Sequence, residues 1–216
     1  MEGMGKQMTR CVIVGASPFV DATVLTAYLR DDDYIIAADG GCALLTAMGR
    51  RPHFIIGDFD SSSMPLKEDV PCDRLPTHKD DTDVFAAAKT ALGNGYRDFL
   101  LLGCLGGRLD HTVSNLFLLR FLHAHGANGI LVDECHEVTL LCEGSHTVLP
   151  RKGYYLSLLP YGGEAEGVTI LGAEYPLENA VLDTMFPLGV SNGFLDSAVT
   201  VTIKKGCLLQ VLAKKE

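Results

Sequence analysis

The sequence predicts an α/β domain with a parallel, Rossmann-like three-layer sheet, followed by an all-β antiparallel sandwich or barrel. Two observations lead to this prediction. In the first part of the chain, short and fully apolar runs alternate with helical patterns, as in parallel sheets that helices cover on both faces. From Glu137 onward the apolar runs often alternate with polar residues and are separated by Gly, Pro and Asn, which indicates antiparallel strands. We place the boundary within residues 133–137, which gives an α/β domain over 10–135 and a β domain over 136–216.

Apolar runs and helical spacing locate the elements of the first domain. The runs read as buried strands, and three of the helical patterns end at a glycine, which is a common stop for a helix. The expected strands are 11–15, 34–38, 53–57, 99–103 and 130–133, and the expected helices are 19–30, 42–48, 82–92 and 112–125. In the second domain we expect strands at 138–142, 146–149, 154–159, 168–171, 198–203 and 208–212, and no helix.

The composition excludes several classes of partner. The 216 residues include 18 Lys and Arg against 27 Asp and Glu, a formal net charge of −9. Such a chain repels the phosphates of nucleic acids and anionic lipids, so we expect neither as a partner. No run approaches the roughly 18 apolar residues of a membrane span, and no secretory signal pattern is visible. Seven scattered cysteines without a C-x-x-C pair favour reduced thiols, so we expect a cytoplasmic protein.

Glycine-rich turns and carboxylates follow four of the expected strands. Ligands of open α/β sheets bind beyond the carboxyl ends of the strands, so these positions are the candidate site. The chain lacks a G-x-x-x-x-G-K-[ST] loop and a G-x-G-x-x-G fingerprint, which argues against P-loop NTPases and typical dinucleotide enzymes. The residues in question are Gly15, Ala16 and Ser17; Asp39, Gly40 and Gly41; Asp58 and Asp60; and Gly106, Gly107, Arg108 and Asp110.

Asp58 and Asp60 flank Phe59 in what we expect to be extended chain. Alternate residues of an extended segment point the same way, so the two carboxylates converge and suit a hard cation such as Mg²⁺. The alternative is an Asx-type turn at which the chain leaves the sheet.

Two further segments suggest a site and have structural alternatives. Residues 78–83 hold three aspartates and a lysine at the start of an expected helix, where Asp81 or Thr82 is a natural N-cap. Capping explains some of these acids and leaves the others open to a functional role. Gly106 and Gly107 permit close approach of the backbone to a phosphate, with Arg108 as a fixed cation, whereas Asp110 is either part of the site or a helix cap.

Taken in order, these segments resemble one family, the thiamine pyrophosphokinases. The resemblance rests on five segments between residues 38 and 194 and covers nearly the whole chain. The segments are Ala38-Asp39-Gly40-Gly41, Gly57-Asp58-Phe59-Asp60-Ser61, Lys79-Asp80-Asp81-Thr82-Asp83, Gly103-x-x-Gly106-Gly107-Arg108-x-Asp110-His111 and Ser191-Asn192-Gly193-Phe194.

The resemblance implies transfer of a pyrophosphoryl group from ATP to the hydroxyl of thiamine, with Mg²⁺ as the metal and thiamine diphosphate and AMP as products. It implies that the metal is held by Asp58, Asp60 and Asp83, and that the catalytic cleft contains Asp39, Asp80, Asp110 and Arg108. The candidate nucleotide contacts are Gly15, Ser17, Gly40, Thr82, Gly106, Gly107 and Arg108. Either Asp80 or Asp110 is a candidate to take the hydroxyl proton, and the sequence does not choose between them.

The resemblance also implies a homodimer whose active site lies between the subunits. Every phosphate- or metal-type motif precedes residue 112, whereas the candidate thiamine contacts Tyr175, Ser191 and Asn192 lie beyond residue 170. Some relatives carry Trp where Tyr175 aligns, and a tyrosine ring also stacks on an aminopyrimidine. Three other functions stay open: a pyrophosphokinase for another heterocyclic alcohol such as a hydroxymethylpterin, a metal-dependent phosphohydrolase, and a nucleotide-binding regulator without catalysis.

Overall fold

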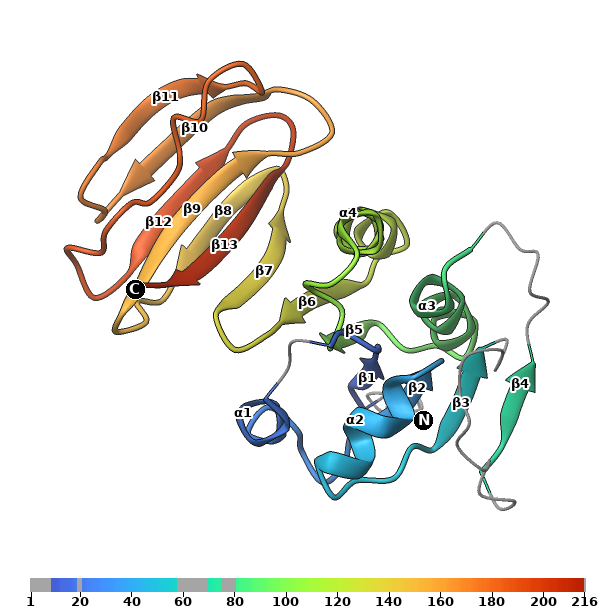
Figure 1. Cartoon of the computed structure of the whole chain (residues 1–216). Helices are drawn as coiled ribbons and strands as arrows, with labels where there is room; N and C mark the ends of the chain where they lie inside the picture. The colour runs from blue at the N-terminus through green and yellow to red at the C-terminus, as the bar shows by residue number, and fades with distance from the viewer. Residues whose placement is uncertain (1–8, 19–20, 58–69, 75–80, 216) are drawn as a thin grey trace, which may run out of the picture. The chain divides into compact units, whose positions relative to one another are not determined.

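The computed structural model describes residues 9–18, 21–57, 70–74 and 81–215. Two compact units divide the chain, Met1–Glu134 and Cys135–Glu216. The first contains a parallel sheet with helices, and the second is built of antiparallel strands, so the predicted fold class is confirmed (Figure 1).

In the described part of the first unit, six parallel strands follow one another in the order β4-β3-β2-β1-β5-β6. The chain runs outward from β1 through β2 and β3 to β4, and then returns to the other side of β1 for β5 and β6. The winding therefore reverses between β1 and β5, and this switch point is where open α/β sheets bind ligands. The strands are Cys11–Val14 (β1), Tyr34–Ala38 (β2), Phe54–Gly57 (β3), Cys72–Arg74 (β4), Asp98–Leu102 (β5) and Asn128–Val132 (β6).

Helices cover both faces of this sheet. Helix α1 packs against α2, and α3 packs against α4, each pair on its own face (Figure 1). Alternate strand residues point to opposite faces, so Val12 and Val14 pack in one cluster with Leu25 of α1 and Leu45 of α2. The helices are Ala22–Thr26 (α1), Gly41–Ala47 (α2), Asp83–Gly93 (α3) and Leu109–Ala124 (α4). None of the helices in the described part of the chain is long and apolar enough to cross a membrane.

Helix α1 is shorter than the expected helix 19–30, of which residues 19–20 lie outside the described residues. Asp21 caps its start by accepting the N–H of Thr23 at 2.8 Å. After Thr26 the backbone bonds tighten, since Tyr28 N–H donates to the carbonyl of Leu25 and Leu29 N–H to that of Thr26. These turn-type bonds end the helix before Arg30.

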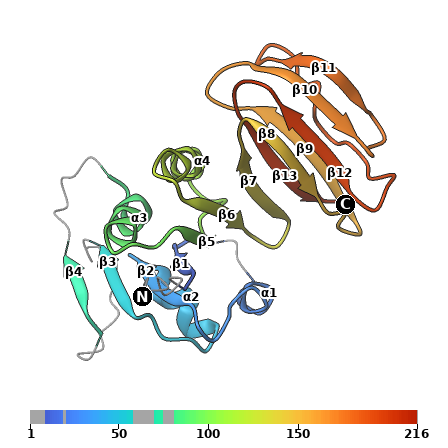
Figure 2. The same cartoon turned by 180° about the vertical axis from the view of Figure 1, so that it is seen from behind.

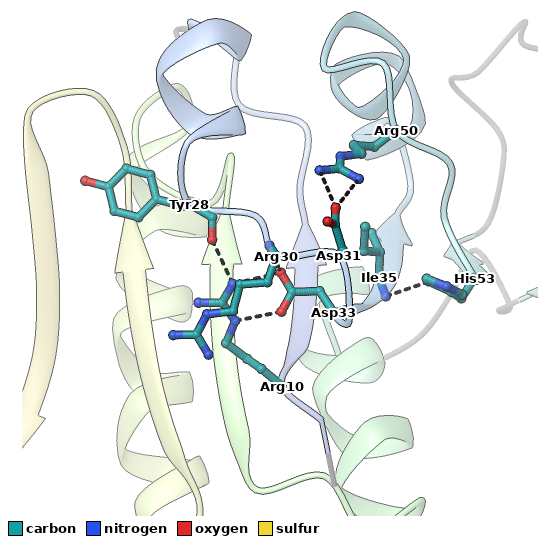
Figure 3. Close-up of polar contacts among 8 residues, drawn as sticks. All are labelled: Arg10, Tyr28, Arg30, Asp31, Asp33, Ile35, Arg50 and His53. Carbon is teal, nitrogen blue, oxygen red and sulfur yellow. Dashed lines mark hydrogen bonds and ion pairs between the residues drawn. The ribbon is translucent and has the colours of Figure 1, made fainter.

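A buried ion pair fixes the amino-terminal edge of the sheet, opposite the strand ends that carry the glycine-rich turns (Figure 3). Arg10 donates from Nε and Nη2 to the two carboxylate oxygens of Asp33, at 2.9 and 2.7 Å. Arg10 also donates to the carbonyl of Tyr28, and Asp33 accepts the N–H of Arg30. The pair therefore ties the start of β1 to the turn that leads from α1 into β2.

The second unit is a sandwich of two antiparallel sheets, with strand orders β7-β13-β9 and β11-β10-β12-β8 (Figure 2). Its core contains buried residues from both sheets, among them Leu156 and Leu158 on one and Val199 and Val201 on the other. The strands are His136–Leu141 (β7), Gly144–Val148 (β8), Tyr154–Pro160 (β9), Ala165–Leu171 (β10), Leu177–Leu182 (β11), Val199–Ile203 (β12) and Leu208–Lys214 (β13).

Cys142 and Cys207 form a disulfide, which corrects the expectation of reduced thiols at these two positions. Cys142 directly follows β7, Cys207 directly precedes β13, and Leu141 pairs with Leu208 in the register of these strands. The two Cα atoms lie 4.1 Å apart although 65 residues separate them in the chain. The strand register that brings them together is not visible in the cysteine spacing. Five other cysteines are free.

Two strands were not expected, and both lie at the edge of a sheet. Strand β4 consists of three exposed residues beside β3, so it carries no apolar run. Strand β11 is mostly exposed beside β10, and their register shifts at two places. Asn179 in β11 has a φ of 48°, a conformation that Asn tolerates better than most residues.

Candidate active site

A pocket of about 310 Å³ lies at the switch point of the first unit. It is lined by the segments that follow β1, β2 and β5 and by residues at the start of α3 and α4. The structure thus brings together turns that lie far apart in the sequence. The predicted site residues that line this pocket are Gly15, Ser17, Asp39, Thr82, Asp83, Gly106, Gly107 and Arg108.

Gly15 and Gly103 let the ends of β1 and β5 approach each other closely. A Cβ atom on Gly15 would lie 2.6 Å from the carbonyl oxygen of Gly103, and one on Gly103 would lie 2.7 Å from the carbonyl oxygen of Gly15. The N–H of Ser17 donates to the Gly103 carbonyl at 2.9 Å. Cys104, the residue after Gly103, also lines the pocket. Burial raises the pKa of its thiol to about 12, so Cys104 is neutral and a poor nucleophile.

The segment from Gly103 to Arg108 is a tight loop that leads into α4. Gly106 and Gly107 have φ angles of 78° and 69°, which are unfavourable for residues with a Cβ atom. Arg108 is the N-cap residue of α4 and provides no side-chain cap. The positive end of the helix dipole therefore adjoins the pocket, an arrangement that suits an anion such as phosphate.

Asn115 and Thr112 of α4 hold this loop, and neither was predicted as a site residue. Asn115 is 5% exposed, lines the pocket and donates from Nδ2 to the carbonyl of Cys104 at 2.7 Å. The Thr112 hydroxyl lies 3.3 Å from the carbonyl oxygens of both Gly106 and Arg108. Asn115 could have been found in the sequence as a polar residue on the face of the expected helix that is buried.

Arg108 and Asp110 form a two-point ion pair. Arg108 Nε donates to Asp110 Oδ1 at 3.1 Å and Nη2 donates to Oδ2 at 2.5 Å. The hydrogen bonds from Arg108, together with its charge and the N–H of His111, lower the pKa of Asp110 to about 2. Arg108 lines the pocket, whereas Asp110 is not among the lining residues. A carboxylate with so low a pKa is a weak base, which argues against Asp110 as the group that takes a proton.

Asp39 reaches the pocket from the end of β2 with an unusual backbone conformation. Its φ is 46°, and its N–H donates to the carbonyl of Ile56 on β3 at 2.8 Å. Gly57 leaves room for this conformation, because a Cβ atom there would lie 3.0 Å from the Asp39 Cα. Backbone strain of this kind persists where the surrounding structure holds a functional side chain in place.

Thr82 and Asp83 combine a structural role with a place in the pocket. Thr82 is the N-cap of α3, and its hydroxyl accepts the N–H of Phe85 at 3.3 Å. Asp83 is the acid in the first helical turn. Asp81 pairs instead with Lys89 at 2.7 Å and does not line the pocket.

The predicted metal site is only partly within the described residues. Asp58, Asp60 and Asp80 lie outside them. Among the described residues, no three His, Cys, Asp or Glu side chains gather into a metal-binding group. The pocket nevertheless offers oxygen atoms of the kind that Mg²⁺ prefers, on Asp39 and Asp83. The buried Ser17 Oγ makes no hydrogen bond within the part of the chain that the structure describes, which fits a ligand contact at this place.

Gly40 follows β2 as predicted, and its proposed contact with the nucleotide stays a prediction. Gly40 is the N-cap of α2 and is not among the residues that line the pocket. A Cβ atom on Gly40 would lie 2.9 Å from that of Ala16. Close packing of α2 against the turn after β1 is therefore the structural reason for a glycine here.

The candidate thiamine contacts form one group in the second unit. Tyr175 is 62% exposed, whereas Asn192 is 4% exposed. Both polar groups of the Asn192 side chain bond to the backbone of Tyr175, at 2.8 Å each. Ser191 has a φ of 58°, and its N–H donates to the hydroxyl of the buried Ser157 at 3.0 Å. These assignments to thiamine stay predictions.

Two family models match the chain. The model of the thiamin pyrophosphokinase catalytic domain matches residues 25–131, and the model of the thiamin pyrophosphokinase vitamin B1 binding domain matches residues 145–208. The chain belongs to the thiamine pyrophosphokinase family. The first match lies within the unit that contains the pocket, and the second within the antiparallel unit. Members of the thiamine pyrophosphokinase family are ATP-dependent diphosphotransferases, and this chain is an enzyme of that class.

Individual thiamine pyrophosphokinases resemble the chain over most of its length. The chain is 26% identical to the thiamine pyrophosphokinase of Bacillus subtilis strain 168 over 193 residues, which cover 87% of this chain and 90% of the relative. The solved B. subtilis structure has a TM-score of 0.86 at 24% identity and covers 96% of this chain and 100% of its own, a likeness of fold. The thiamin pyrophosphokinase structure from Geobacillus thermodenitrificans has a TM-score of 0.84 at 28% identity, with 96% of this chain and 99% of that chain covered.

Proposed function

We propose that this chain transfers the pyrophosphoryl group of ATP to the hydroxyl of thiamine, giving thiamine diphosphate and AMP. The observation that carries the proposal is the pocket at the switch point, where a glycine loop, Arg108 and the carboxylates of Asp39 and Asp83 line one cavity. Attack of an alcohol on the β-phosphorus needs the phosphate charge neutralised and the attacking and leaving oxygens held in line. Cationic and oxygen-donor groups around one pocket are the parts that this reaction needs.

Asp39 and Asp83 would hold Mg²⁺ within the described residues, and the sequence adds Asp58 and Asp60 to that set. Bound there, Mg²⁺ would neutralise charge on the transferred phosphates. Arg108 is the candidate to bind an outer phosphate oxygen through its planar fork. Asn115 and Thr112 keep the loop before Arg108 in shape through its carbonyl groups.

The roles of the two candidate bases differ in this proposal. Asp110 orients Arg108 through their ion pair. The same pair lowers the pKa of the Asp110 carboxyl to about 2, so Asp110 is too weak a base to take the hydroxyl proton. Asp80 stays the sequence-based candidate to take the hydroxyl proton of thiamine.

A homodimer with the active site between subunits is part of the proposal. The second unit exposes apolar side chains in the segment after β11, among them Met185, Phe186 and Leu188 at 88, 66 and 47%. Asp183 orders this segment by accepting the N–H groups of Met185 and Phe186. Ordered and exposed apolar side chains in succession are typical of a surface that binds a partner, and we propose a second copy of the chain.

A cytoplasmic location is also proposed, on the strength of five free cysteines. Disulfides such as Cys142–Cys207 are uncommon in that compartment. Alkylation in a denaturing lysis buffer, which exposes the buried Cys11 and Cys104, distinguishes the two situations. Seven modified thiols indicate a reducing compartment, and five indicate that the bond persists.

A panel of acceptors tests the function. Purified chain, ATP and Mg²⁺ are incubated with thiamine, with a hydroxymethylpterin or with no acceptor, and AMP and the organic diphosphate are quantified by chromatography. The proposal predicts that AMP and thiamine diphosphate form in equal amounts, and only in the mixture that contains thiamine. AMP without an organic diphosphate would identify a phosphohydrolase, and a pterin product would identify the other kind of pyrophosphokinase. Absence of AMP with every acceptor would identify a protein that binds nucleotide without catalysis.

A further inference from the structure

We propose that Asn192 is a positioning residue: its buried side chain holds the backbone of Tyr175 so that the exposed Tyr175 ring is a fixed surface for the aromatic ring of thiamine. Asn192 then acts through Tyr175 and does not itself contact the substrate. The inference rests on the proposed function, and it replaces the expectation that Asn192 offers hydrogen bonds to a pyrimidine edge.

The contacts of the Asn192 amide support this role. Tyr175 N–H donates to Asn192 Oδ1 and Asn192 Nδ2 donates to the Tyr175 carbonyl, both at 2.8 Å. One side chain therefore fixes the donor and the acceptor of a single residue, as a neighbouring strand does. At 4% exposure, the Asn192 amide is shielded from a ligand that arrives from solvent.

Asn192 is itself anchored to the core of the second unit. Its N–H donates to the carbonyl of Leu156 on β9 at 2.8 Å, and its carbonyl accepts the N–H of Leu156 at 2.9 Å. Leu156 is fully buried. The link from β9 through Asn192 to Tyr175 therefore transmits the rigidity of the sandwich core to an exposed loop.

The segment around Tyr175 has two further ties to the same stretch of chain. Glu174 N–H donates to the Gly193 carbonyl at 3.0 Å, and Ala173 forms a β-bridge with Phe194. The backbone just before Tyr175 is thus paired with the backbone just after Asn192, while the Tyr175 ring remains 62% exposed. A rigid aromatic ring binds a planar ligand with less loss of conformational entropy than a mobile one.

The substitution Asn192→Asp tests the link with little change in shape. It keeps an oxygen to accept Tyr175 N–H but places a second oxygen against the Tyr175 carbonyl, where the amide had donated. We expect KM for thiamine to rise about tenfold, the size expected for one lost buried hydrogen bond, with KM for ATP within about twofold. Asn179→Asp is the matched control, because Asn179 Oδ1 accepts a hydrogen bond from Lys204 and a carboxylate also accepts it.

A double-mutant cycle separates positioning from direct contact. If Asn192 acts through the ring, Asn192→Asp raises KM for thiamine no further in a chain that already carries Tyr175→Ala. If the two substitutions multiply their effects on this KM, Asn192 contacts the substrate and the proposal is wrong.

Fluorescence gives a test that does not depend on activity. The chain has no tryptophan, so Tyr175→Trp introduces a single probe at the ring. We expect Asn192→Asp to lower the fluorescence anisotropy of this probe, in the absence of substrate, at a temperature at which circular dichroism shows both proteins folded. Unchanged anisotropy would overturn the proposal even if the chain makes thiamine diphosphate. Lowered anisotropy in a chain that makes none would support the link and contradict the proposed function.

Discussion

Arg108 donates two hydrogen bonds to Asp110, two residues further along the chain and beside the pocket. Both side chains are exposed, by 71% and 64%, so the pair is open to ligands. The pair keeps the Arg108 guanidinium close to the start of α4, where the glycine loop and the helix dipole favour an anion. We therefore assign Asp110 as the partner of Arg108, the cation that we propose to bind phosphate.

The first prediction concerns pH. Because the pKa of Asp110 is lowered to about 2, its carboxylate gains a proton only as the pH falls through that value. Asp110 is then ionised throughout the range above about pH 4. We expect the acid limb of the kcat profile to have the same midpoint in the wild type and in Asp110→Asn, measured with saturating substrates. Loss of the acid limb in the variant would identify Asp110 as the base.

The second prediction concerns Arg108. Arg108→Lys keeps the positive charge and loses the planar guanidinium, which has enough N–H groups to bind Asp110 and a phosphate oxygen together. KM for ATP should rise about tenfold while KM for thiamine stays within about twofold. Steady-state kinetics with each substrate varied in turn provides both values. A raised KM for thiamine with an unchanged KM for ATP would contradict the placement of Arg108 on the nucleotide.

The third prediction compares two neighbouring aspartates. Asp83 lines the pocket, whereas Asp81 pairs with Lys89 outside it. Asp83→Asn removes the charge proposed to hold the metal, so kcat at saturating Mg²⁺ should fall by about two orders of magnitude or more. Asp81→Asn should change kcat by less than about threefold, because an exposed ion pair contributes little. Equal losses of kcat in the two variants would show that the total negative charge of this segment matters, and not a metal site at Asp83.

The fold and the site differ in how much the sequence could predict. The buried strands of the first unit were predictable because each is a continuous apolar run, such as Cys11–Val14 and Tyr34–Ala38. The exposed strand Cys72–Arg74 was not, because it has no run of apolar residues and depends on β3 for its pairing. Apolar runs in the sequence therefore predict the strands of the core, whereas an edge strand such as β4 forms because of the strand beside it.

The contacts that the sequence did not predict are long-range. The amide of Asn192 meets Tyr175 across 17 residues, and Cys142 meets Cys207 across 65. Both depend on strand register, which hydrophobic patterning does not fix for an all-β unit. The positive φ of Asp39 depends on β3 and Gly57, which are distant in the sequence. The residues next to Asp39 therefore do not indicate this conformation. The glycines after β1 and β5 were predictable as site residues because open α/β sheets bind ligands at those strand ends.

The fourth prediction concerns stability at the opposite edge of the sheet. Asp33→Asn leaves Arg10, whose side chain is only 11% exposed, without its carboxylate partner. This should lower the free energy of unfolding by about 3–5 kcal/mol. Asp31→Asn is the matched control in the same turn, because Asp31 is 97% exposed in its pair with Arg50 (Figure 3). The control should change stability by less than about 0.5 kcal/mol. Urea titration measures both, and equal effects would contradict a buried pair.

The fifth prediction concerns our proposal that two subunits share each active site. Asp83→Ala damages the pocket of the first unit, and Tyr175→Ala damages the proposed thiamine surface of the second. When the two variants exchange subunits, a shared site places both lesions in one cleft and leaves the other intact, so activity at low thiamine returns. Mixing chains with different affinity tags establishes that exchange takes place. Exchange without recovered activity would show that each chain builds its own site.

Phosphorus NMR of the chain with ATP, Mg²⁺ and thiamine shows whether ATP bound at this pocket donates a pyrophosphoryl group to thiamine. We expect the three ATP signals to give way to the single signal of AMP and the paired signals of one organic diphosphate, in equal amounts. With Asp83→Asn we expect neither product to appear at a comparable rate. Formation of ADP, or of AMP with free pyrophosphate, would contradict the proposed transfer.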